Sequence, residues 1–318
     1  MAQIGKNINY AAELLRKNHA VAIPTETVYG LAANALNEKA VLKIFEIKQR
    51  PFFDPLIVHL TSINEVDKYA NWQDKRLYKL AEKFWPGPLT ILLPKKEIIP
   101  DLVTSGLNCV AVRVPNHPLT LELLKRLDFP LAAPSANPFG YVSPTCSYHV
   151  DKQLGNKLDY ILDGGVCSIG MESTIVGIEG SQLCIYRLGG LTLEEIEKIC
   201  GETVLKINNS DNPKSPGQLK NHYSPKIPLI TGNIKDLLIS HQNKKLAVIC
   251  FGEINYPEFK GTLLNLSPKK SLQEAALNLF DFLRRADESN AELVICDWVP
   301  DEGLGKAIND RLKRAASN

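Results

Sequence analysis

The sequence predicts an α/β protein with two domains, because short apolar runs alternate with helical patterns and this alternation stops once and then restarts. A turn-rich, apolar-poor segment at 208–217 marks the interruption. The length of 318 residues also favours about two domains. We therefore expect a first domain at 1–206, a linker at 207–225 and a smaller domain at 226–318.

The first domain is predicted to hold a mostly buried sheet covered by helices. The expected strands, short and rich in apolar residues, cover 20–23, 56–60, 90–93, 110–114, 131–133, 160–162, 174–178 and 184–187. The expected helices cover 8–17, 38–48, 76–84, 119–126 and 193–199. Thr192 and Glu195 form the spacing of a capping box at the start of the last helix. Some neighbouring strands can pair antiparallel, so we expect a mixed sheet.

The second domain is predicted to be a small doubly wound α/β unit of about ninety residues. Its expected strands cover 228–231, 246–251 and 293–297, and its expected helices cover 234–241, 272–286 and 305–315. Ser271 and Glu274 have the spacing of a second capping box.

Charge and cysteine content limit the functional classes. The formal net charge is +2, from 37 basic and 35 acidic residues, so any contact with RNA must come from a local patch. The seven cysteines are odd in number and form no CxxC, which argues against a disulfide framework or a zinc knuckle and predicts buried free thiols. No apolar run has the length of a membrane span, and the first residues lack a signal-peptide core. We expect a cytoplasmic protein.

Polar residues gather around the predicted strand at 20–23 and the helix at 38–48. Thr25, Glu26 and Thr27 follow a strand end, where α/β sheets bind ligands, although a helix N-cap would use the same residue types. Lys48 and Arg50 end a helix, where cations suit the helix dipole. Arg50 also begins a loop bracketed by two prolines, and a stiff loop can hold a guanidinium against a phosphate.

Later strands carry further polar residues whose role local patterns leave open. A histidine inside a strand, as His59 is, is more often structural than catalytic. Arg113 lies inside an apolar strand and must be at an edge or buried with a partner, such as a carboxylate. Ser135 and Asn137 stand between prolines and suit either ligand binding or an ordinary turn. Segment 170–174 leads into a predicted strand and segment 186–190 follows one. Both can be plain turns with surface polar residues or parts of a binding site.

Several enzyme classes are excluded by missing motifs. The chain has no GxxxxGK[ST], no HExxH, no GxSxG and no kinase motif set. Its six histidines show no spacing typical of metal ligands.

Seven motifs occur in order along the chain: PTETVYGL, KQRP with DPLIVH, FWPGPLTILL, VAVRVP, APSAN, GMESTIV and YRLGG. This set closely resembles the YrdC-like proteins, which make threonylcarbamoyl-AMP for the tRNA modification N6-threonylcarbamoyladenosine. SPGQLKNHYSP and GLGKAINDRLKRAA resemble the linker and C-terminal domain of the longer, two-domain form. The resemblance implies a twisted mixed sheet in the YrdC-like N-terminal domain and a small Rossmann-like C-terminal domain.

The resemblance implies an L-threonylcarbamoyladenylate synthase, a nucleotidyltransferase that condenses L-threonine, bicarbonate or CO2, and ATP with Mg²⁺, and releases pyrophosphate. By motif, the residues implied to bind threonine are Thr27, His59, Arg113, Ala133 and Ser173. The residues implied to bind the nucleotide are Lys48, Arg50, Ser135, Asn137 and Arg187, with His222 and Tyr223 of the linker as a lid. No covalent nucleophile is assigned, and the metal ligands are unassigned.

Asp54 is a departure, because the family often has Asn at this nucleotide-binding position. An aspartate beside a triphosphate repels it unless the carboxylate binds Mg²⁺ or is turned away.

Two other functions remain as alternatives. One is carbamoyl-adenylate chemistry on another substrate. The other is a double-stranded-RNA-binding or ribosome-maturation module, which the charge balance disfavours. The expected partners of the leading function are tRNA-modifying proteins that receive the product, with weak binding of double-stranded RNA and no membrane.

Overall fold

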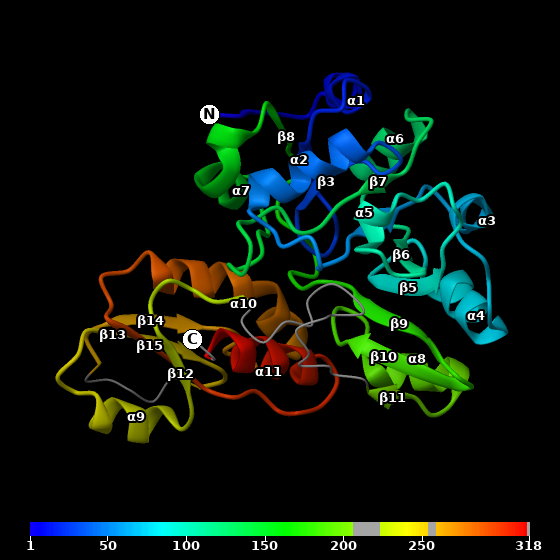
Figure 1. Cartoon of the computed structure of the whole chain (residues 1–318). Helices are drawn as coiled ribbons and strands as arrows, with labels where there is room; N and C mark the ends of the chain where they lie inside the picture. The colour runs from blue at the N-terminus through cyan, green and yellow to red at the C-terminus, as the bar shows by residue number, and fades with distance from the viewer. Residues whose placement is uncertain (206–222, 254–258, 317–318) are drawn as a thin grey trace. The chain divides into compact units, whose positions relative to one another are not determined.

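The structure is a computed structural model, and it describes residues 1–205, 223–253 and 259–316. The chain divides into two compact units (Figure 1). Unit 1 comprises Met1–Phe139, Pro144–Ser168 and Glu172–Leu219, and unit 2 comprises Gly140–Ser143, Ile169–Met171 and Lys220–Asn318. Unit 2 therefore includes two short segments from earlier in the chain, which no local pattern in the sequence indicates.

Unit 1 is built on one mixed sheet. In the described residues it has eleven strands, in the order β1-β8-β2-β3-β7-β4-β6-β5-β9-β10-β11. The strands are β1 (Gln3–Gly5), β2 (Val21–Ile23), β3 (Gly30–Asn34), β4 (Ile57–His59), β5 (Leu89–Pro94), β6 (Cys109–Arg113), β7 (Leu131–Ala132), β8 (Tyr160–Leu162), β9 (Thr174–Glu179), β10 (Gln182–Arg187) and β11 (Val204–Leu205). The sheet contains both parallel pairs, such as β4–β6, and antiparallel pairs, such as β4–β7, so the expected mixed sheet is confirmed.

The helices of unit 1 cover this sheet. They are α1 (Ile8–Arg16), α2 (Glu38–Lys48), α3 (Val66–Tyr69), α4 (Lys75–Phe84), α5 (Asp101–Thr104), α6 (Pro118–Lys125), α7 (Ser147–Leu154) and α8 (Leu193–Cys200), with single 3₁₀ turns at Ile63–Glu65 and Gly155–Lys157. One core lies between α1, α6 and strands β2, β3, β7 and β8. Its apolar stripe on α1 follows from the helical spacing of Ala11, Ala12, Leu14 and Leu15, which are all buried.

The predicted strands and helices of unit 1 are all present, with ends shifted by a few residues. Several elements were not predicted, namely strands β1, β3 and β11 and helices α3, α5 and α7. Strand β3 is small-residue rich and has no alternating pattern, yet it is central and pairs antiparallel with β2 and β7. Helix α7 has a weakly apolar sequence, and it buries His149, Val150 and Leu154. Tertiary packing, rather than local periodicity, decides both elements.

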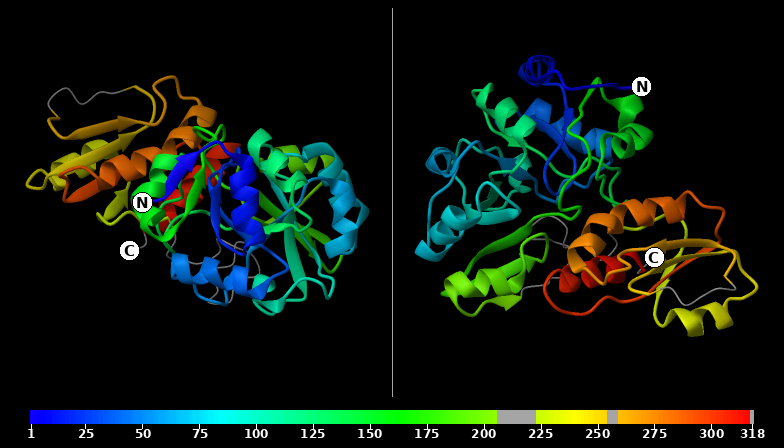
Figure 2. Two further views of the ribbon diagram at one scale, coloured as in Figure 1. Left: turned by 90° about the horizontal axis from the view of Figure 1, so that it is seen from above. Right: turned by 180° about the vertical axis from the view of Figure 1, so that it is seen from behind.

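Unit 2 is a four-stranded parallel sheet in the order β12-β15-β13-β14. Its elements are β12 (Leu229–Thr231), α9 (Ile234–Ser240), β13 (Leu246–Cys250), β14 (Thr262–Asn265), α10 (Leu272–Asp287), β15 (Leu293–Cys296) and α11 (Leu304–Ala315). Helices α9 and α10 lie on opposite sides of this sheet in Figure 1 and in the right-hand view of Figure 2. The predicted doubly wound arrangement is therefore present, with β14 as a strand that the sequence reading missed.

Local details agree with the sequence in most places. The capping box of Thr192 and Glu195 is complete. Ser271 caps α10 through the Glu274 amide, but the Glu274 carboxylate accepts from Ser267 instead of closing a second box. All seven cysteines are free, four buried and three partly exposed, so the expected burial holds only for the four. No helix in the described ranges is long and apolar enough to cross a membrane.

Candidate active site

The turn between β2 and β3 holds the first group of predicted site residues. The Thr25 hydroxyl lies 2.7 Å from the Thr27 hydroxyl and donates to the Val28 carbonyl at 2.6 Å. The same oxygen accepts from the amides of Thr27 and Val28 at 3.2 Å. A strand follows this turn, so the helix N-cap interpretation is wrong. Thr25 thus builds a turn that fixes Glu26 and Thr27 at the strand end.

Arg113 is buried in the middle of the sheet and has a carboxylate partner. Its Nη2 lies 2.6 Å from Oε1 of Glu26, and the two side chains are only 4% and 5% exposed. Nε of Arg113 donates to the Gly87 carbonyl at 3.2 Å, and the Asn116 amide donates to Glu26 at 3.0 Å. Of the two expectations for an arginine in this strand, the buried and paired one is confirmed.

His59 is the neighbour of Arg113 on the adjacent strand. The parallel register of β4 and β6 pairs the two residues, and Nδ1 of His59 lies 3.2 Å from the Ile57 carbonyl. The same carbonyl accepts from the Ala133 amide at 2.9 Å. Burial, with the Arg113 charge, lowers the pKa of His59 from 6.5 to about 3. His59 is therefore neutral at physiological pH and offers hydrogen bonding rather than charge.

Lys48, the last residue of α2, joins two of the predicted motifs. Its Nζ donates to the carbonyl of Ser135 at 2.5 Å and to the carbonyl of Asn137. Burial and the nearby Arg50 charge lower the pKa of Lys48 well below 10.5, whereas Asp54 opposes this shift. The carbonyls orient the ammonium group inside unit 1 beside the two small polar residues.

The loop after α2 holds Arg50 against Asp54. Nε of Arg50 donates to the Asp54 carbonyl at 3.0 Å, and Nη2 donates to the Pro55 carbonyl at 2.8 Å. Nη2 also lies 2.8 Å from Oδ2 of Asp54, which is fully buried. This contact is an ion pair without hydrogen-bond geometry, because neither carboxylate oxygen of Asp54 accepts a hydrogen bond from the described residues. The carboxylate is thus turned onto the guanidinium.

Arg187, at the end of β10, is tied to Ser173. Its Nε and Nη2 donate to the Ser173 carbonyl at 3.1 and 2.9 Å, and Nη2 reaches Oγ at 3.1 Å. The Ser173 hydroxyl also lies 2.7 Å from the hydroxyl of Thr90. Burial raises the pKa of Asp54, and the charges of Arg50, Lys48 and Arg187 oppose this rise. The four charged groups are therefore close enough to interact.

Most of the predicted site residues lie in unit 1. Some further residues lie beside them, and one predicted residue lies in unit 2. Thr90 and Cys167 were missed as members, whereas Glu26 was singled out with its threonine neighbours but given no role. Burial raises the pKa of Cys167, and the nearby Glu26 charge adds to the rise. Tyr223 belongs to unit 2, where it is buried and stacks on Phe280 at 5.6 Å. His222 lies outside the described residues.

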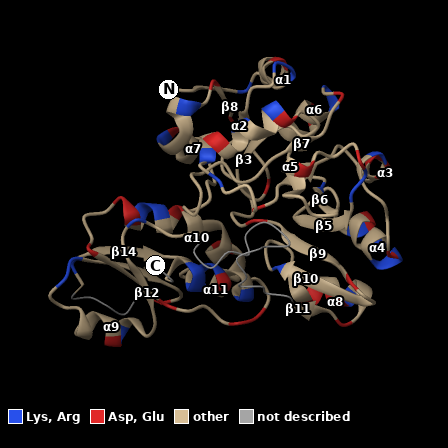
Figure 3. Cartoon of the chain, viewed as in Figure 1, with Lys and Arg blue, Asp and Glu red and all other residues tan. Residues whose placement is uncertain are grey.

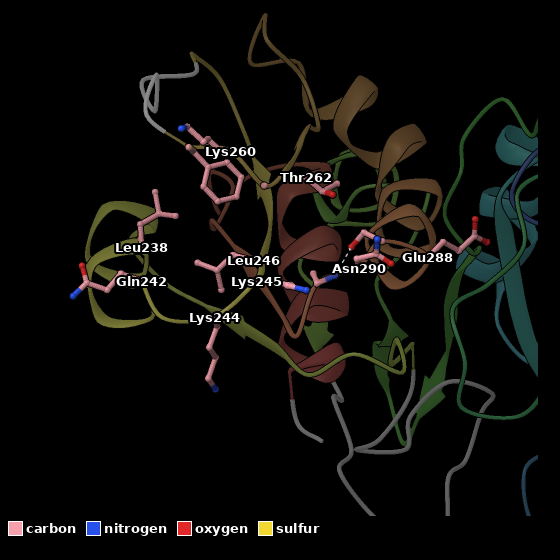
Figure 4. A pocket seen from close by; sticks show the side chains of 13 residues that line it. Leu238, Gln242, Lys244, Lys245, Leu246, Lys260, Thr262, Glu288 and Asn290 are labelled. Atoms are coloured by element: carbon pink, nitrogen blue, oxygen red, sulfur yellow. Dashed lines mark hydrogen bonds between the residues drawn. The ribbon is translucent and has the colours of Figure 1, made fainter.

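A separate hollow of about 1200 Å³ lies in unit 2 (Figure 4). Lys244, Lys245 and Lys260 are among its lining residues, close to the first residues of β13 and β14. Ligands of α/β sheets bind at the carboxyl ends of strands, whereas this hollow is at the amino ends. It contains none of the predicted site residues, so we place the candidate active site in unit 1.

A mixed α/β unit with a buried basic site, followed by a small parallel α/β unit, defines a class of two-domain proteins suited to small anionic ligands. A family model for Sua5, YciO and YrdC proteins, described as "Telomere recombination", matches residues 13–189, and one described as "Threonylcarbamoyl-AMP synthase, C-terminal domain" matches 191–317. The chain belongs to the Sua5/YciO/YrdC family and has the two-domain form.

Relatives match over nearly the whole length. A threonylcarbamoyl-AMP synthase of Pyrococcus abyssi is 39% identical over 97% of this chain and 94% of its own. The enzyme of that name from Bacillus subtilis is also 39% identical, over 97% and 92%. The crystal structure of P. abyssi Sua5 complexed with L-threonine matches with a TM-score of 0.91 at 37% identity, covering 99% of this chain and 97% of that one.

Proposed function

We propose that this protein is a cytoplasmic L-threonylcarbamoyladenylate synthase that converts L-threonine, bicarbonate or CO2, and ATP into threonylcarbamoyl-AMP and pyrophosphate. The observation that carries the proposal is the set of four cations buried in unit 1. Lys48, Arg50, Arg113 and Arg187 are 1%, 7%, 4% and 7% exposed. Carbonyl oxygens accept hydrogen bonds from all four cations, and the carboxylates of Asp54 and Glu26 pair with Arg50 and Arg113. The four cations outnumber these two carboxylates, and buried positive charge favours anionic substrates.

The threonine part of the site is assigned to the Arg113 group. The threonine carboxylate would bind the guanidinium of Arg113 beside Glu26, since a charge-assisted pair is the strongest contact available to it. Thr27, His59, Ala133 and Ser173 complete this subsite. Neutral His59 suits the amine or the hydroxyl, because it adds no repulsion to an ammonium group.

The nucleotide part is assigned to Lys48, Arg50, Ser135, Asn137 and Arg187, with a lid role for His222 and Tyr223. Threonine's amine would capture CO2 as a carbamate, and a carbamate oxygen would attack the α-phosphate of ATP, displacing pyrophosphate. Both reactants are anions, so cations fixed beforehand lower their repulsion in the transition state. Catalysis then rests on positioning and charge, without a covalent protein intermediate.

The described residues offer limited ligation for Mg²⁺. They contain no cluster of three or more acidic, histidine or cysteine side chains placed to hold a metal ion. A Mg²⁺ ion needs oxygen ligands and commonly takes them from phosphates and one or two carboxylates. The Asp54 carboxylate lies against the Arg50 guanidinium, so we assign the metal's ligands to the phosphates and water rather than to Asp54. Bound Mg²⁺ would neutralise phosphate charge, so we propose that the metal enters with ATP.

An RNA-binding function is less well supported. Figure 3 shows basic and acidic residues mixed along helices such as α2 and α10. The buried cations of unit 1 are recessed too far to follow an extended phosphate backbone. We therefore assign tRNA-modifying proteins as the receivers of the product rather than RNA as the main ligand.

The test is pyrophosphate release with ATP, Mg²⁺, bicarbonate and L-threonine, each omitted in turn, with the product identified by mass spectrometry. Release that needs both threonine and bicarbonate is expected. Release without threonine would instead indicate another carbamoyl acceptor or simple ATP hydrolysis. Lys48→Met should lose synthesis, and Lys39→Met, an exposed lysine of the same helix, is the matched control.

A further inference from the structure

Two short segments of unit 2 border the candidate active site along the chain. Segment 140–143 follows Asn137 by three residues, and segment 169–171 precedes Ser173 by two. Both segments pack on helix α10 of the same unit. Residues of the proposed site are therefore joined through a few backbone residues to segments that belong to unit 2.

Arg284 of α10 secures segment 140–143. The side chain is 3% exposed, its Nε donates to the Ser143 carbonyl at 3.3 Å, and its Nη2 donates to the Val142 carbonyl. Its guanidinium lies 5.1 Å from the ring centre of Tyr141, whose hydroxyl donates to Asp287 at 2.6 Å. Hydrogen bonds from a buried charge are the stronger kind, so losing the donor takes a strong partner from two carbonyls.

Gly170 brings segment 169–171 directly onto the backbone of α10. Its φ is +76°, and a Cβ at this position would lie 2.6 Å from Cα and 2.7 Å from the carbonyl oxygen of Leu277. Only glycine permits both the left-handed backbone and this close approach. The segment therefore has a single well-defined place on the helix.

Residues on either side of segment 140–143 are held inside unit 1. Lys48 holds the carbonyls of Ser135 and Asn137, and the Tyr29 amide donates to the Pro144 carbonyl at 2.8 Å. Between these anchors, Arg284 holds the carbonyls of Val142 and Ser143, and the Ser224 amide donates to the Gly140 carbonyl at 3.0 Å. Substrate-binding groups must be placed to a fraction of an ångström for efficient reaction.

We propose that helix α10 acts as a brace, meaning that it holds in position the loop at 135–143, which carries the proposed nucleotide-binding residues Ser135 and Asn137. Arg284 is then a positioning residue for synthesis. This gives the C-terminal domain a role separate from any lid. The inference rests on the proposed function for its kinetic consequence. Its structural part, the fixing of 140–143 and 169–171 by α10, stands independently.

The experiment compares full-length Arg284→Met with the wild type by hydrogen exchange and steady-state kinetics. Exchange should rise within 140–143 and the flanking site residues, while the strands of unit 1 keep their protection. The KM for ATP should rise about tenfold, the change that 1.4 kcal/mol produces, with a much smaller change in the KM for threonine. Arg284→Lys, which keeps one charged donor, should recover part of both effects.

Arg285→Met is the matched control. Arg285 is the next residue on α10, but its side chain is 56% exposed, and its Nη1 lies 3.8 Å from Oδ2 of Asp281. This variant should match the wild type in exchange and in kinetics.

Unchanged exchange and an unchanged KM for ATP in Arg284→Met would overturn the proposal. So would a loss of protection spread evenly over both units, because this would show a general structural role. If Arg284→Met does not fold, Tyr141→Phe removes a single hydrogen bond of the same brace and should raise exchange at 140–143 alone. If exchange changes locally in Arg284→Met but the wild type makes no threonylcarbamoyl-AMP, the proposed function is refuted. The structural role of α10 as a brace would then still stand.

Discussion

The buried pair of Arg113 and Glu26 gives the sharpest test of the site, because stability and threonine binding depend on it in different ways. The two side chains meet at 2.6 Å and are 4% and 5% exposed. In Arg113→Met the Glu26 carboxylate stays buried without its cation, which costs about 3–5 kcal/mol. For a protein of this size, the melting temperature should fall by roughly 6 to 20 °C.

The double variant Glu26→Met/Arg113→Met separates the two roles. Replacing both members of a buried ion pair with apolar side chains is often close to neutral for stability. The double variant should therefore melt near the wild type. Its KM for threonine should stay raised by about 10- to 150-fold, since a charged hydrogen bond worth about 1.5–3 kcal/mol to the substrate carboxylate is missing.

The assays are thermal unfolding and threonine-dependent pyrophosphate release. Lys17→Met, which breaks the exposed pair of Lys17 and Glu13, should leave the melting temperature unchanged. Recovery of normal threonine use in the double variant would refute the carboxylate role of Arg113. An unchanged melting temperature in Arg113→Met would refute the energetic argument for the pair.

Three further predictions concern pH, charge and packing. The pKa of His59 is lowered in the folded protein, so its full contribution to the free energy of unfolding is present above pH 6.5 and is lost progressively toward about pH 3. In urea unfolding, His59→Gln should lose less stability than the wild type over this pH range. Asp54→Asn removes a negative charge among the phosphate-binding cations and should tighten ATP binding several-fold by calorimetry; weaker binding would contradict this. Gly170→Ala should lower the melting temperature more than Gly165→Ala, because both have φ near +78° but only Gly170 touches Leu277; equal shifts would contradict the close packing.

The local pattern of the sequence was sufficient for the elements with strong periodicity. Helix α1 was predicted because its apolar residues repeat at helix spacing, and strand β9 was predicted because it is a short apolar run. Strand β3 has small residues without alternation, and β14 is short and half-buried, so neither carries such a signal. Their pairing partners make them strands.

For the candidate site, the sequence by itself determined the residue types and their order, including Lys48 and Arg50 at a helix end and Arg113 inside a strand. Only the tertiary structure decided the partners. Arg113 pairs with Glu26 across 87 positions, although β3, β7 and β4 separate β2 from β6 in the sheet. Local periodicity reports which side of an element is buried, whereas the choice of ion-pair partner depends on which distant elements pack together. The same reason explains why segments 140–143 and 169–171 belong to the second unit.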